Sequence, residues 1–101
     1  MLKFHKELLK RFAPVGKRAK IILFGSLAKG SYRLDSDIDL AIATEDKNLM
    51  KLASSIADDI LAEYGKLVVL KFVRKEDLEK RKSRLIEEIR KGVVIYNGRK
   101  C

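Results

Sequence analysis

Two aspartates stand one residue apart at the start of an apolar segment, within the sequence SDIDLAI of residues 36–42. The alternation predicts a strand over residues 37–43, with apolar side chains on a core face and acidic side chains on a face that meets something else. Side chains two residues apart on a strand point the same way, with Cα atoms about 6.6 Å apart. Asp37 and Asp39 therefore aim at one spot, where unpaired charge is costly unless a cation meets it.

The remaining apolar patterns predict further helices and strands, and glycine and proline residues mark their ends. A short amphipathic helix is expected to be ended by Pro14 and Gly16, and the longest helix by Gly65. The apolar segment VVIY is expected to add to a sheet edge or to a partner. The expected elements are helix 2–12, strand 19–24, helix 47–64, strand 66–73, a short helix after it, helix 83–91 and segment 93–96.

Small residues follow the expected central strand 19–24 directly. Gly25 has no Cβ to block a close approach, and Ser26 stands at the start of one or two helical turns, whose N-terminal partial charge attracts anions. Lys29 can reach toward a phosphate. Alone, Gly-Ser is more often an ordinary turn and Asp-x-Asp an exposed strand face. Together they predict a site for a nucleoside triphosphate and Mg²⁺, in which two ions about 4 Å apart would clamp the attacking and leaving oxygens.

The segment GSLAKGSYRLDSDIDLAI, residues 25–42, resembles the signature of the DNA polymerase β-like nucleotidyltransferase superfamily. That signature is an apolar residue, Gly-Ser, a spacer of about nine to thirteen residues and then Asp-x-Asp. The short chain also resembles the minimal nucleotidyltransferases of archaea and bacteria. The resemblance implies an α+β fold with a small mixed β-sheet backed by helices. It implies one domain over residues 1–101, with a motif core at 19–74 and C-terminal helices and a short strand at 75–96.

The resemblance also implies roles for the motif residues. Asp37 and Asp39 would be the catalytic carboxylates and would ligate one or two Mg²⁺ ions. ATP would be the substrate, and the residues holding it would be Gly25, Ser26, Lys29 and Ser36. Family members transfer a nucleoside monophosphate, commonly AMP, to a hydroxyl and release pyrophosphate. Minimal members often act as the antitoxin of a HEPN-type toxin, a small helical ribonuclease, in studied cases by adenylylating a toxin tyrosine.

The sequence departs from the family pattern at a third carboxylate, which in the family ligates metal and serves as general base on the strand after the long helix. Here that strand is KLVVLKFV, and parity with the acidic face selects Val69 or Lys71, with Val69 favoured. We expect Lys71 to pair with Asp37 or Asp39 and to weaken metal binding. Glu45 and Asp46 could substitute for the missing acid, but we expect them to lie too far along the preceding strand.

Composition restricts the class of protein and its partners. The chain has 23 Lys and Arg against 14 Asp and Glu, a net charge of +9, which favours polyanionic partners, although Lys and Glu enrichment also marks proteins from hot environments. The only cysteine is Cys101, so we expect no internal disulfide and a reducing compartment. No run approaches about 18 apolar residues, so a cytoplasmic protein without a membrane span is expected. His5 has no Cys or His companion and supports no zinc site.

Three functions follow from these observations. The first is an enzyme that uses ATP and Mg²⁺ to modify a hydroxyl of a partner protein, as a HEPN-type antitoxin would. The second is a catalytically impaired antitoxin or binding subunit on the same fold, because the third carboxylate is missing. The third is a basic RNA-binding domain, whose RNA affinity would fall steeply with salt. A homo-oligomer stays open in each case.

Overall fold

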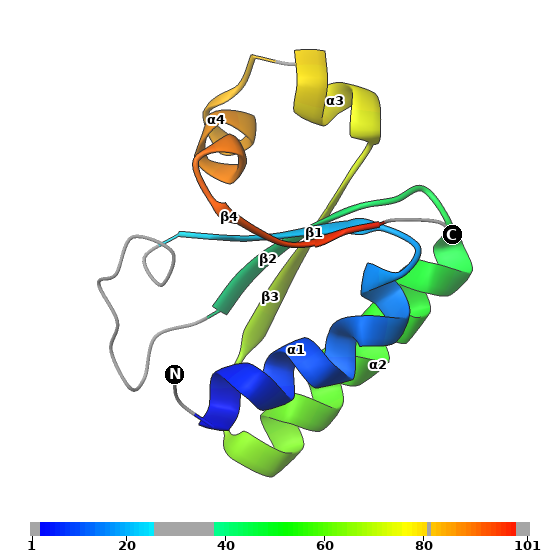
Figure 1. Ribbon diagram of the computed structural model, residues 1–101, viewed down its shortest axis with the longest axis vertical. Coiled ribbons are helices and arrows are strands. Elements are labelled where there is room, and N and C mark those ends of the chain that lie inside the picture. The colour runs from blue at the N-terminus through cyan, green and yellow to red at the C-terminus, as the bar shows by residue number, and fades with distance from the viewer. Residues whose placement is uncertain (1–2, 26–37, 81, 99–101) are drawn as a thin grey trace.

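The computed structural model describes residues 3–25, 38–80 and 82–98. In this part of the chain four helices and four strands follow one another along the sequence (Figure 1). In chain order they are α1 (Lys3–Gly16), β1 (Lys20–Phe24), β2 (Ile38–Ala43), α2 (Lys47–Tyr64), β3 (Val68–Val73), α3 (Lys75–Lys80), α4 (Arg84–Arg90) and β4 (Val93–Asn97). None of the described helices combines the length and the apolar character that crossing a bilayer requires.

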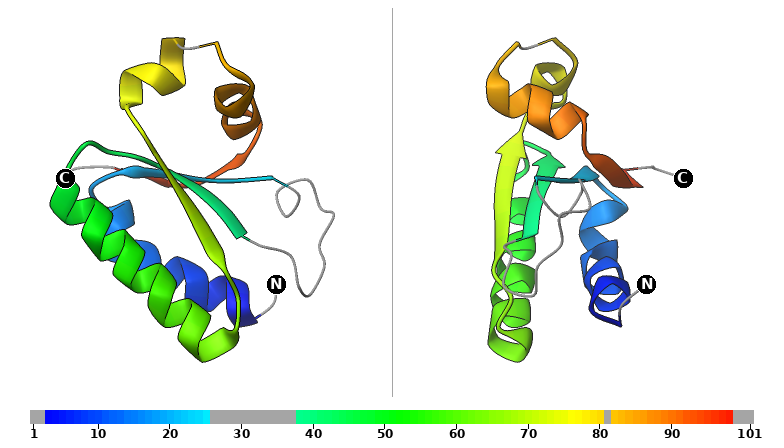
Figure 2. Two further views of the ribbon diagram at one scale, coloured as in Figure 1. Left: turned by 180° about the vertical axis from the view of Figure 1, so that it is seen from behind. Right: turned by 90° about the vertical axis from the view of Figure 1, so that its left-hand side faces the viewer.

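The four strands form one mixed sheet in the order β3-β2-β1-β4. Strand β1 is antiparallel to both of its neighbours, β2 and β4, whereas β2 and β3 run parallel. Helices α1 and α2 lie on one face of the sheet, and α3 and α4 lie on the other (Figures 1 and 2). The expected α+β fold with a small mixed sheet backed by helices is therefore confirmed.

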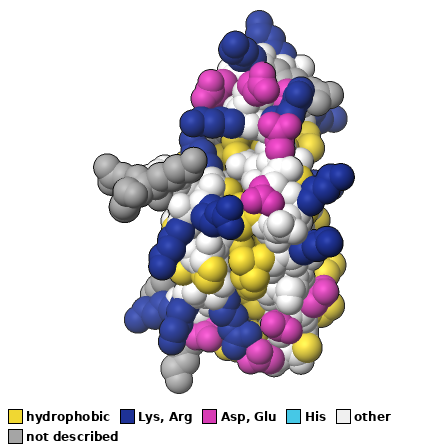
Figure 3. All heavy atoms as spheres, turned by 90° about the vertical axis from the view of Figure 1, so that its right-hand side faces the viewer, with side chains coloured by type: hydrophobic (Ala, Val, Ile, Leu, Met, Phe, Trp, Pro, Cys, Tyr) yellow, Lys and Arg dark blue, Asp and Glu magenta, His cyan; other side chains and the backbone are white. Residues whose placement is uncertain are grey.

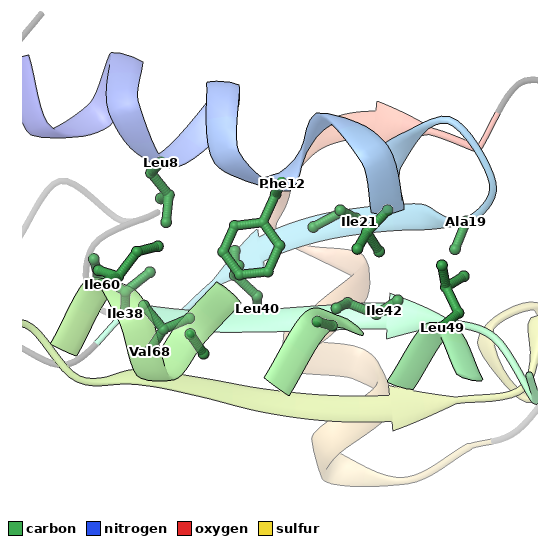
Figure 4. Close-up of a cluster of buried hydrophobic side chains, with 13 residues drawn as sticks. Leu8, Phe12, Ala19, Ile21, Ile38, Leu40, Ile42, Leu49, Ile60 and Val68 are labelled. Atoms are coloured by element: carbon green, nitrogen blue, oxygen red, sulfur yellow. The ribbon is translucent and has the colours of Figure 1, made fainter. Parts of the chain in front are cut away.

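The larger core lies between the sheet and the helix pair α1 and α2 (Figure 4). Helical spacing brings Leu8 and Phe12 of α1 onto the apolar face of β2, where Leu40 and Ile42 are fully buried. Burying each such side chain contributes about 1.5–3 kcal/mol, so packing against α1 and α2 helps to hold β2 in place. The strand that carries the acidic motif is thus fixed from its apolar side, as expected.

The opposite face of β2 differs from the prediction. Ala41 has the same parity as Asp39 but is only 1% exposed, because it packs in a second core with Ile22, Phe24 and Ile89. Helix α4 covers this part of the sheet. The face of β2 that carries Asp39 is therefore buried in this second core at Ala41. Asp39 lies two residues earlier, near the beginning of the strand.

Helix α1 continues farther than the sequence suggested. Pro14 lies inside the helix, which runs to Gly16, although proline inside a helix removes a backbone donor and usually ends it. Two contacts explain the extension: Val15 is completely buried, and Gly16 lies so close to the ring of Tyr96 that a Cβ there would overlap it. Tertiary packing outweighs the local signal.

The other boundaries follow local signals more closely. Helix α2 begins after Asp46, whose carboxylate accepts hydrogen bonds from two backbone amides of the first turn, and Gly65 ends it with φ of 67°. Strand β3 begins at Val68 rather than at residue 66. The VVIY segment pairs with β1, so it is a sheet edge, and the hydroxyl of Tyr96 donates to the carbonyl of Leu9 at 2.6 Å.

Candidate functional site

The described part of the acidic motif lies at the corner where β1 ends and β2 begins. Phe24, the last residue of β1, pairs with Asp39. The next residue, Gly25, has φ of 83°, a conformation that favours glycine. A Cβ at Gly25 would overlap the carboxylate of Asp39. Glycine is therefore required at position 25 for two reasons: the backbone angle φ and the closeness of the Asp39 carboxylate.

The carboxylate of Asp39 lies on the same side of the sheet as α3 and α4, and the residue is half-buried. The fold and the strand pairing bring Asp39 of β2 together with Gly25, which follows β1, and with Val69 of β3. The other predicted site residues lie outside the described residues: Ser26, Lys29, Ser36 and Asp37. Of the residues predicted to bind the nucleotide or the metal, the structure therefore describes two, Gly25 and Asp39.

The parallel pairing of β2 with β3 decides what stands where the family has its third acid. Asp39 is in register with Val69, and Ala41 is in register with Lys71. Neighbouring strands lie about 4.8 Å apart, so Val69 adjoins Asp39 directly. Lys71 is exposed, and among the described residues no ion pair joins Lys71 to Asp39, whereas the other expected partner of Lys71, Asp37, lies outside the described residues. The described neighbour of Asp39 on β3 is therefore apolar.

The two acids considered as substitutes lie at the other end of β2. Glu45 comes six residues after Asp39, about 20 Å along an extended chain. Asp46 is engaged in capping α2, with its carboxylate accepting from the amide of Asn48 at 2.9 Å, and it also meets Arg18 at 3.3 Å. Neither residue can act beside Asp39, as the sequence predicted.

The donor chemistry at the corner fits a hard divalent cation in part. Carboxylate oxygen is the ligand type that Mg²⁺ prefers, and Asp39 presents it where no side chain grows from Gly25. Within residues 3–25, 38–80 and 82–98, no group of three or more acidic, histidine or cysteine side chains could hold a metal ion. A complete Mg²⁺ site at this corner therefore needs oxygen donors besides Asp39.

Two cavities, which the sequence did not signal, lie at the opposite end of the sheet. One, of about 680 Å³, is lined by residues at the ends of β2 and β3 and by α2, α3 and α4. The other, of about 420 Å³, is lined by three cationic residues, Arg18, Lys20 and Lys75, among others. Only the general rule that ligands bind beyond the carboxyl ends of parallel strands could have pointed to the first.

An ion pair joins the two helices α1 and α2, on the face of the sheet opposite the carboxylate of Asp39. The guanidinium of Arg11 binds both carboxylate oxygens of Glu63, at 2.6 and 2.7 Å, and lies 5.6 Å from the ring centre of Tyr64. Hydrogen bonding to Arg11 lowers the pKa of Glu63, and the same contact raises the pKa of Arg11. This clamp fixes α1 against the end of α2.

Comparison with known proteins agrees with this architecture. A family model described as Polymerase beta, Nucleotidyltransferase matches residues 6–100. A crystal structure of a toxin-antitoxin with AMP-PNP is similar in fold, with a TM-score of 0.65 and 21% identity over 95% of this chain and 74% of that chain. No curated protein matches the sequence.

Proposed function

Because this chain belongs to the polymerase beta nucleotidyltransferase family, we propose that it transfers AMP from ATP to a hydroxyl group of a partner protein. The observation that carries the proposal is the corner at which the carboxylate of Asp39 lies against Gly25. An oxygen donor beside a turn without a side chain suits a metal-bound polyphosphate. The similar structure of a toxin-antitoxin with AMP-PNP supports the choice of adenine nucleotide and of a toxin as the partner.

The proposed roles follow the motif. Asp39 and Asp37 hold the cation, and the polyphosphate is held by Gly25, Ser26, Lys29 and Ser36. When bound, Mg²⁺ neutralises the charge of the phosphate oxygens. An acceptor oxygen forms a bond to the α-phosphorus, the bond from that phosphorus to the bridging oxygen breaks, and pyrophosphate leaves. The proton of the acceptor hydroxyl would pass to water, because β3 has no carboxylate to accept it and Val69 stands beside Asp39.

The lack of a carboxylate on β3 favours a second candidate function. In this function the chain is a subunit that binds nucleotide and partner with little or no transfer. A missing general base commonly lowers a rate by about 10²–10⁴-fold. The register that places Val69 next to Asp39 is the specific observation behind this second function. In this case the chain would neutralise a toxin by binding it, and nucleotide turnover would be residual.

One experiment separates the two functions. The protein is incubated with ATP labelled at the α-phosphate, Mg²⁺ and a candidate HEPN-type helical ribonuclease, and label on the ribonuclease is counted. Transfer that the variant Asp39→Asn abolishes supports the enzyme. A stable complex without label supports the binding subunit. Absence of both nucleotide binding and complex formation would refute the proposal in both forms.

A further inference from the structure

Strand β3 forms one edge of the sheet, and in the described residues it pairs only with β2. The carbonyls of Leu67 and Val73 accept hydrogen bonds from β2 and from the residue after it, at 2.9 and 3.0 Å. Backbone groups alternate in direction along a strand, so Val68, Leu70 and Phe72 direct their N–H and C=O groups away from β2. Val68 is buried, so Leu70 and Phe72 are the residues of this edge that offer backbone pairing to an added strand.

The side chains of β3 differ on its two faces. Leu70 and Phe72 pack partly against the larger core beneath α2 and keep part of their surface exposed. On the other face Lys71 stands exposed between Val69 and Val73. Lys71 is the only charged residue of the strand. An added strand would therefore meet apolar side chains on one face and a single cation on the other.

The cavity of about 680 Å³ lies at the end of this edge. Phe72 belongs both to the strand edge and to the cavity wall, which also includes Met50 of α2 and Leu85 of α4. These residues come from both faces of the sheet, so apolar side chains pointing either way can enter. Two cations, Lys47 and Arg74, and two carboxylates, Glu45 and Asp77, also line it, and Arg74 is paired with Asp77 at 3.2 Å. The charge that selects the partner is therefore that of Lys71 on the strand rather than that of the cavity. Figure 3, which faces the side where α2 begins, shows apolar surface in the middle, with Lys and Arg side chains on both of its sides and Asp and Glu side chains among them.

We propose that the β3 edge binds an extended segment of a partner protein, with alternating apolar residues and a carboxylate opposite Lys71. Backbone hydrogen bonds would supply affinity, and the cavity would supply a pocket for an apolar side chain, as in strand addition generally. We infer a carboxylate on the partner segment because opposite charges on adjacent strands attract, and because this chain has a net charge of +9.

The same charge argues against a second copy of this chain as the occupant. Two β3 strands paired antiparallel about Lys71 would place the two Lys71 side chains directly opposite each other, where like charges are destabilising. Pairing about Leu70 would still place them diagonally on one face, about 7–8 Å apart. The net charge of +9 on each copy adds to the repulsion. An acidic segment of another protein meets neither obstacle.

The test uses two blocked nine-residue peptides of alternating valine and threonine, one with a central glutamate and one with a central lysine. Wild-type protein should bind the glutamate peptide about fivefold more tightly, as cross-strand charge pairs suggest. The variant Lys71→Glu should reverse this preference. The matched control Lys51→Glu, an exposed charge reversal on α2, should keep the wild-type order. Thermal denaturation checks that each variant folds.

Hydrogen exchange shows where the peptide binds. The amides of Leu70 and Phe72 should exchange more slowly when the glutamate peptide is present, and N-methylation of alternate peptide residues should remove the effect. Slower exchange on β4 instead, equal affinity for both peptides, or no saturable binding would overturn the proposal. Concentration-dependent dimers that protect the same two amides would assign the edge to a second copy and overturn it as well. All these readouts are independent of nucleotide transfer.

Discussion

Replacing Gly25 by alanine should damage the site far more than the fold. A non-glycine residue at φ of 83° costs about 1–2 kcal/mol, which in a chain of this size lowers Tm by roughly 4–8 °C for each kcal/mol. The added Cβ would also overlap the carboxylate of Asp39 and must displace it. A displacement of about 1 Å at a reacting centre can cost about 100-fold in rate.

Gly65→Ala is the matched control for this variant. Gly65 has φ of 67°, so it carries a similar backbone cost, but a Cβ there would meet nothing within 4 Å. Both variants are compared by thermal denaturation, by calorimetric titration with Mg²⁺ and ATP, and by label transfer. Similar losses of Tm with about 100-fold weaker transfer in Gly25→Ala alone are expected. Equal nucleotide binding and transfer in the two variants would refute the assignment of this corner as the site.

Three further predictions concern other parts of the structure. Val69→Asp should raise label transfer by about 10²-fold or more if a base beside Asp39 is what the site lacks, and unchanged transfer would argue against that register-based explanation. Tyr96→Phe removes a 2.6 Å hydrogen bond to a carbonyl of α1 and should cost about 1 kcal/mol in urea denaturation, with an unchanged m-value. Because Arg11 lowers the pKa of Glu63 from 4.5, the stabilisation from Glu63 should be present above about pH 4.5 and disappear as the pH falls through the lowered pKa. A denaturation series from pH 7 to pH 3 should therefore show the wild type converging with Glu63→Gln in acid; a constant gap would contradict the pairing.

Features that depend on neighbouring residues were the most predictable. The ends of α2 were foreseen to the residue, because Asp46 and Gly65 satisfy backbone groups at the two ends of that helix locally. The alternation in β2 likewise predicted which of its side chains face α1 and α2. Helix α1 was misjudged at Pro14, since its last turn is stabilised by contacts with β4, far away in the sequence.

The candidate site divides in the same way. The sequence alone was enough to connect Gly25 with Asp39, because the motif has a recognisable spacing and each residue type has a direct chemical reason to be there. Parity narrowed the third-acid position to Val69 or Lys71, and only the pairing of β2 with β3 placed Val69 next to Asp39. The register of two paired strands depends on the sequences of both, so it cannot be predicted from either strand alone.

By itself, the sequence determined the types of the elements, the ends of α2 and the acidic motif, since these rest on local periodicity, capping and residue chemistry. Tertiary structure alone decided that β3 runs parallel to β2 at a sheet edge, that α4 buries Ala41, and that residues from α2, β3 and α4 enclose a cavity. Those features depend on which surfaces become buried against one another when the chain folds. Apolar side chains from all of the elements determine that arrangement together, so no single segment predicts it.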